Sequence, residues 1–104
     1  MSFALLYITH ESEAEARRIS DLLIEQKLIA CANLFPINSI YWWGGEVVKE
    51  GEWVSLVKTT LEKSKTVEAA VLAIHTYQTP CIMKMEVTAN ASYEAWIEDM
   101  VKTA

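Results

Sequence analysis

Three side chains of this sequence, His75, Cys31 and Cys81, belong to the types that bind copper or zinc in proteins. A neutral imidazole binds Cu²⁺ or Zn²⁺, and a thiolate is a soft ligand that favours Cu(I) or Zn²⁺. Cys81 follows His75 by six residues, just beyond Pro80. Cys31 can join them only if its strand approaches the end of the helix that precedes His75. We take these three residues as candidate ligands for Cu²⁺ or another divalent cation.

Each candidate also has an ordinary structural interpretation. His75 stands where a helix is expected to end, and a helix C-terminus attracts a cationic side chain without any metal. One histidine is not a metal site. Cys31 is expected to be buried in a strand, as small cysteines commonly are. His10 precedes the first expected helix without a spaced partner, so we expect it at the surface of a loop.

A second group of polar residues could line a cleft between subunits: Lys58, Tyr77 and Glu86. The sequence contains no H-E-x-x-H, G-x-S-x-G, P-loop or C-x-x-C motif. Its arginines, Arg17 and Arg18, fall within the first expected helix, not in a phosphate-binding loop. We therefore expect no enzymatic activity.

Composition bounds the class of protein. The 104 residues suit one domain, 1–104, and 52% of them are apolar, which is enough for a packed core. The net charge of −5 disfavours nucleic acid as a partner. The short apolar run 3–8 follows no positive segment, which disfavours a signal peptide or a membrane span. With only two cysteines, a reducing, cytoplasmic location is the expectation.

The periodicity of apolar residues predicts an α+β fold. Strands are expected at 3–9, 30–43, 53–59 and 81–88. Helices are expected after capping signals at Ser12, at Thr59 and at Ser92. The order β-α-β-β-α-β with an added C-terminal helix is the ferredoxin-like pattern, in which two helices cover one face of a four-stranded antiparallel sheet.

The segment SIYWWGGE (39–46) predicts a long hairpin that carries Tyr41, Trp42 and Trp43. Its tip is expected between Gly44 and Gly51. Successive side chains of a strand point to opposite faces. One indole should therefore lie in the core, and the other should pack at a subunit interface. This predicts a homo-oligomer in which the hairpin contacts a neighbouring subunit.

Four short segments occur in the order found in the CutA divalent-cation-tolerance family: ACANL (30–34), SIYWWGGE (39–46), VKTT (57–60) and HTYQTP (75–80). The chain resembles that family over nearly its whole length. The resemblance implies a ferredoxin-like subunit, a tight homotrimer whose long hairpins meet between subunits, and binding of divalent copper in copper tolerance. It also implies a trimer like that of the PII signalling proteins.

The sequence departs from the family pattern at several positions. Members with assigned copper ligands have a cysteine and a histidine where this chain has Ile8 and Ile74, so that only His75 matches. Thr76 replaces a proline, and Cys81 stands where an acidic residue is common. The resemblance favours a copper-binding protein of metal tolerance. The alternatives are a PII-like regulator that binds a small anion or nucleotide between subunits, and a trimeric hub for protein partners.

Overall fold

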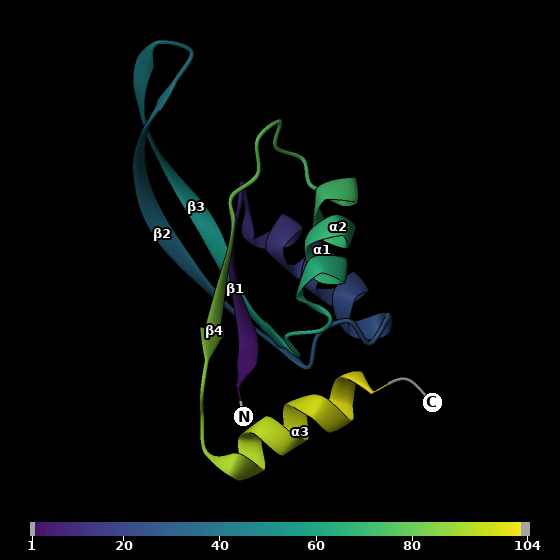
Figure 1. The fold of residues 1–104 in the computed structure, drawn as a ribbon. Coiled ribbons are helices and arrows are strands. Elements are labelled where there is room, and N and C mark those ends of the chain that lie inside the picture. The colour runs from purple at the N-terminus through teal and green to yellow at the C-terminus, as the bar shows by residue number, and fades with distance from the viewer. Residues whose placement is uncertain (1, 103–104) are drawn as a thin grey trace.

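The computed structural model describes residues 2–102 as one four-stranded antiparallel sheet with three helices (Figure 1). The strand order is β2-β3-β1-β4. This confirms the predicted α+β class and element order. The elements are β1 (Phe3–His10), α1 (Glu13–Glu25), β2 (Cys31–Trp43), β3 (Glu46–Thr59), α2 (Ser64–Ile74), β4 (Ile82–Val87) and α3 (Ala91–Val101).

The core lies between one face of the sheet and the helices α1 and α2. Alternate residues of the central strand β1 point into it, and Ala4, Leu6 and Ile8 are buried there. Helical spacing supplies the opposite wall, in which the buried residues are Ile19, Leu23, Val67 and Val71. The helix C-terminus of α2 and the end of β1 are thereby brought side by side, and this arrangement positions the candidate site.

The strands β2 and β3 form one long hairpin that turns at Gly44 and Gly45. Trp43 pairs with Glu46, and the two glycines have φ angles of 60° and 80°. Positive φ at both central residues is the type I′ geometry, which matches the twist of the strands. Gly51, the other predicted end of the tip, lies within β3 opposite Asn38.

The part of the hairpin from residue 38 to residue 51, here called the hairpin arm, projects beyond the helices (Figure 1). An 11-residue helix such as α2 is roughly 16 Å long, whereas the 13 residues of β2 span roughly 43 Å. The helix α1, with 13 residues, is only slightly longer than α2, so neither α1 nor α2 covers the arm. The side chains of Trp42 and Trp43 are therefore 74% and 51% exposed, and the expectation that one indole lies in the subunit's core is wrong.

Two of the three predicted helix caps are also wrong. Ser12 does cap α1, because its hydroxyl accepts a hydrogen bond from the Glu15 N–H at 3.2 Å. Thr59, however, donates its hydroxyl to the backbone carbonyl of Leu28 and does not cap a helix. The helix α2 begins only at Ser64. Ser92 lies inside α3, which begins after Asn90.

The last helix, α3, lies at the end of the sheet where β1 begins (Figure 1). The Tyr93 ring meets Phe3 edge-on, with 6.2 Å between the ring centroids. Lys63 donates to the carbonyl of Val101 and so fastens the end of α3 to the start of α2. Within residues 2–102, no helix is both long enough and apolar enough to cross a membrane.

Candidate functional site

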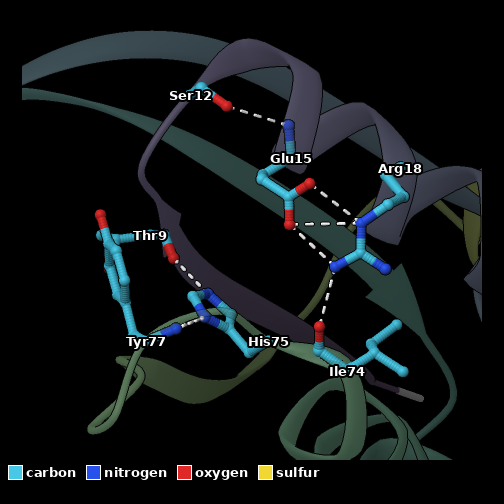
Figure 2. Close-up of polar contacts among 7 residues, drawn as sticks. All are labelled: Thr9, Ser12, Glu15, Arg18, Ile74, His75 and Tyr77. Atoms are coloured by element: carbon cyan, nitrogen blue, oxygen red, sulfur yellow. Dashed lines mark hydrogen bonds and ion pairs between the residues drawn. The ribbon is translucent and has the colours of Figure 1, made fainter.

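The imidazole of His75 bridges the end of α2 to the end of β1. Its Nε2 lies 2.7 Å from the carbonyl oxygen of Thr9, and its Nδ1 lies 3.0 Å from the backbone nitrogen of Tyr77 (Figure 2). A carbonyl only accepts and an N–H only donates. His75 is therefore the neutral tautomer with its proton on Nε2, and both ring nitrogens are already engaged.

The carbonyl of Ile74, the last residue of α2, has a partner from the other helix. Arg18 donates to that oxygen at 2.8 Å and also contacts the Glu15 carboxylate (Figure 2). The Arg18 guanidinium satisfies a helix-end acceptor that α2 itself cannot pair. The separate hydrogen bond between Arg18 and Glu15 lowers the pKa of Glu15 and raises that of Arg18. The network fixes the segment that places His75.

His10 is not the surface loop residue that the sequence suggested. It is the last residue of β1 and is fully buried, and its Nε2 lies 2.8 Å from the Ser55 hydroxyl. Its ring is stacked on that of His75, with centroids 5.2 Å apart. Burial first, and then the nearby His75, lower the pKa of His10 to about 4. The ring of His10 therefore stays neutral at neutral pH.

A cavity of about 680 Å³ lies between the hairpin arm and the segment 76–81, which connects α2 to β4. Thr9 contributes to its wall from the end of β1, and Glu52 contributes from the middle of β3. The Cys81 thiol also lines it, and its pKa is raised by burial and, secondarily, by the charge of Glu52. A soft thiol and a carboxylate thus share one cavity.

Two tyrosine hydroxyls donate to carboxylates beside this cavity. Tyr77 donates to Glu52 at 2.6 Å, and Tyr41 donates to Glu50. Burial and the Glu52 hydrogen bond raise the pKa of Tyr77, and the Glu50 hydrogen bond is the main cause that raises the pKa of Tyr41 to about 12. Both phenols therefore remain neutral donors to the carboxylates.

The remaining predicted site residues lie toward the other end of the sheet. Cys31 pairs with Lys58, whose ammonium is 3.9 Å from the Cys31 sulfur, and Lys58 in turn pairs with Leu5 of β1. Glu86 pairs with Ala4 and accepts a hydrogen bond from the Ser2 hydroxyl. One subunit therefore does not bring Lys58 and Glu86 to Tyr77, and it does not bring Cys31 to His75.

These positions decide how well the chain fits the copper ligands expected from the sequence. The His75 lone pair is occupied by the Tyr77 N–H, and Cys31 lies far along the sheet. Among the described residues, Glu52 is the one carboxylate that lines the cavity with the Cys81 thiol. No group of three or more His, Cys, Asp or Glu side chains within residues 2–102 is arranged to hold a metal ion. The set His75, Cys31 and Cys81 is not assembled within one subunit.

Sequence reasoning missed two of the residues that matter most here. Glu52 carried no motif, and its position in the cavity depends on the β2–β3 register, which sets it opposite Ile37. His10 did carry a signal, because it continues the alternation of Ala4, Leu6 and Ile8 toward the helices. That alternation predicts a buried position.

Comparison with known proteins gives the same family as the sequence motifs. A family model described as CutA1 divalent ion tolerance protein matches residues 4–100. The chain belongs to the CutA1 family. The divalent-cation tolerance protein CutA of Thermotoga maritima is 40% identical over 98 residues, which is 93% of this chain and 97% of that protein. The CutA protein of Archaeoglobus fulgidus is 41% identical over 98 residues, with 93% and 96% covered.

Solved CutA structures have the same subunit fold. The Archaeoglobus fulgidus structure, described as a periplasmic divalent cation tolerance protein, has a TM-score of 0.93 at 40% identity and covers 98% of this chain and 100% of its own. A CutA from a Nostoc species, described as PII-like, has a TM-score of 0.87 at 27% identity, with 95% and 97% covered. The resemblance inferred from the four short segments is confirmed.

Proposed function

We propose that this CutA1-family chain binds a divalent cation in metal tolerance, and that the ion contacts Cys81 and Glu52 in the cavity beside the hairpin arm. The observation that carries this proposal is the shared cavity of a thiol and a nearly buried carboxylate. A thiolate with one carboxylate suits Zn²⁺ or copper better than Ca²⁺ or Mg²⁺. The family name supports a divalent cation, and no catalytic step is part of the proposal.

In this proposal His75 organises the site without binding the ion. Its two nitrogens hold Thr9 and Tyr77, and both of those residues line the cavity. Metal binding at His75 would break the hydrogen bond from Tyr77 and loosen the wall. Two side chains do not complete a tight site, so the remaining ligands must come from water, from small molecules or from another subunit.

The test is chelator competition with Cu²⁺, repeated with Zn²⁺ because zinc does not oxidise thiols. We expect Cys81→Ser to weaken binding at least tenfold. Cys31→Ser is the matched control, because it removes the other thiol far from the cavity, and it should bind as the wild type does. His75→Ala should keep most of the affinity if it remains folded. Equal affinity in Cys81→Ser and the wild type would contradict the proposed ligand.

We further propose that the working unit is a homotrimer in a reducing, cytoplasmic compartment. The exposed apolar side chains of the hairpin arm, Ile40, Trp42 and Val47, support assembly, as do Met83 and Met85 on the sheet face away from α1 and α2. The free thiols of Cys31 and Cys81 are compatible with reducing conditions. Multi-angle light scattering at micromolar concentration should give three times the subunit mass. A monomer there would contradict the assembly.

The cavity's charge disfavours the alternative of a small anion or nucleotide. Its wall includes the Glu52 carboxylate, and among residues 2–102 of one subunit no lysine or arginine lines it. An anion placed there would be repelled at short range with no counter-charge. Within one subunit, Lys58, the cation expected to serve such a site, lies toward the other end of the sheet, beside Cys31.

A further inference from the structure

The cavity beside the hairpin arm is much larger than a metal ion requires. Its volume of about 680 Å³ is in the range typical of sites for small organic molecules. Three aromatic rings line it, those of Tyr41, Trp43 and Tyr77. Two rings come from the arm and the third from the segment after α2, so the aromatic surface faces the cavity from both sides.

Among the described residues, the cavity wall carries a negative charge, that of Glu52, without a positive one beside it. Glu52 is only 8% exposed, and the Tyr77 hydroxyl is the one hydrogen-bond donor that it receives among residues 2–102. No ion pair to Glu52 is present in that part of the chain either. An ionised carboxylate accepts several hydrogen bonds, and burying it without a counter-charge is costly. Glu52 therefore has acceptor capacity left for a cation that enters the cavity.

A second carboxylate, that of Glu50, adds to the negative charge near the cavity. Glu50 lies close enough to receive the Tyr41 hydroxyl, and the charges of both glutamates act on Tyr41 and on Tyr77. Glu50 does not line the cavity itself, and it acts there through its hydrogen bond from Tyr41 and through its charge. Aromatic faces attract cations through their quadrupole, with Trp the strongest, and the attraction increases when the cation is desolvated. Carboxylates with aromatic walls are the combination that recognises organic ammonium groups.

We propose that this cavity binds a small organic cation, an ammonium group bearing methyl or methylene carbons, between Trp43 and Tyr77 with Glu52 as its counter-charge. A hydrated metal ion gains nothing from aromatic walls, whereas methyl groups on nitrogen pack against them. This ligand is additional to the metal ion. It shares Glu52 with the proposed metal site but uses the rings in place of the Cys81 thiol, so the two proposals can fail separately.

The first arm of the test needs no variant. Choline chloride and 3,3-dimethylbutan-1-ol have nearly the same shape, but only choline carries a charge. Both are titrated into the full chain in metal-free buffer, with calorimetry and tryptophan fluorescence as readouts. We expect saturable binding of choline and at least tenfold weaker binding of the alcohol. Equal binding of the two would overturn the cation proposal, and so would the absence of any binding.

The second arm locates the site. Glu52→Gln keeps an acceptor for the Tyr77 hydroxyl but removes the charge, and it should weaken choline binding at least tenfold. Glu62→Gln removes a charge from the exposed turn before α2 and is the matched control. Trp43→Leu should also lose binding, whereas Trp96→Leu on α3 should not. Unchanged choline affinity in both Glu52→Gln and Trp43→Leu would place choline elsewhere and overturn the proposal.

The third arm separates this ligand from the metal ion. Cys81→Ser should retain choline binding while it loses metal affinity, and Trp43→Leu should show the reverse. Circular dichroism and light scattering check that each variant keeps its fold and assembly. Loss of choline binding in Cys81→Ser would contradict the assignment of choline to the aromatic wall. A Cys81→Ser variant that loses metal affinity but still binds choline supports the choline proposal.

Discussion

The two ends of the β2–β3 hairpin experience opposite environments, although the same strands run through both. Near β1, the residues of β3 that face the helices, such as Ser55 and Val57, are completely buried. In the hairpin arm, Ile40 and Trp42 lie on the same face of the sheet as those residues but are 71% and 74% exposed. The difference is the reach of α1 and α2, which end before the arm begins (Figure 1).

This contrast shows that residue type alone does not assign a role. The covered end is stabilised by burial of apolar side chains, worth about 25 cal/mol per Å². The arm is held by its ladder of hydrogen bonds and by its turn. Its large apolar residues therefore stabilise the single subunit little, and their presence is accounted for by what the arm contacts, a neighbouring subunit or a ligand. The predictions below compare substitutions at the two ends.

The largest effect is expected from Leu6→Ala at the covered end. Leu6 is fully buried between the sheet and the helices, and truncation leaves a cavity that the packed core cannot fill. We expect a loss of about 2–5 kcal/mol in the free energy of unfolding. Urea unfolding at a fixed subunit concentration measures it. A loss below about 1 kcal/mol would mean that the core is not closed around Leu6.

The next effect is a dependence on pH that arises from His10. The folded pKa of about 4 is below the ordinary 6.5, so the unfolded chain takes up the proton first as the pH falls. Stability is therefore complete above pH 6.5 and declines toward pH 4 by up to about 3 kcal/mol per subunit. The free energy of unfolding is measured across that range for the wild type and for His10→Phe, which keeps a stacked ring.

The His10→Phe variant separates this contribution from that of the carboxylates. Its loss of the Ser55 hydrogen bond lowers stability by a constant amount, while the slope between pH 6.5 and 4 should become flatter than that of the wild type. Identical slopes in the two proteins would show that His10 is not the group that titrates. The nearby charges of Glu15, Glu52 and Arg18 are present in both proteins and cancel in the comparison.

His10 also shows what the sequence could and could not predict. Alternation along β1 places it on the buried face, and the fold class follows from such local patterns. Its stacking on His75 joins residues far apart in the chain and depends on where β1 ends relative to α2. The separation of Cys31 from His75 likewise follows from strand register. Local periodicity predicts elements and faces, but register and helix reach decide which side chains meet.

A smaller effect is expected at the tip of the arm from Gly44→Ala. The φ angle of Gly44 is 60°, and although nothing lies within 4 Å of an added Cβ, the backbone conformation itself is unfavourable for alanine. The expected loss is about 1–2 kcal/mol. Gly51→Ala is the matched control, because its φ is not positive and its nearest neighbour is 3.9 Å away. Thermal unfolding of both variants checks this, and equal losses would contradict the turn geometry.

The smallest effect on the subunit itself is expected from Trp42→Ala in the arm. Trp42 pairs across the hairpin with Val47, and such exposed pairs are worth roughly 0.2–1 kcal/mol. If the arm contacts another subunit, the larger loss is in assembly, and the wild type's melting temperature should rise with protein concentration because association stabilises the folded state. That rise should shrink in Trp42→Ala. A melting temperature that depends equally on concentration in both proteins would contradict the predicted contribution of Trp42 to assembly.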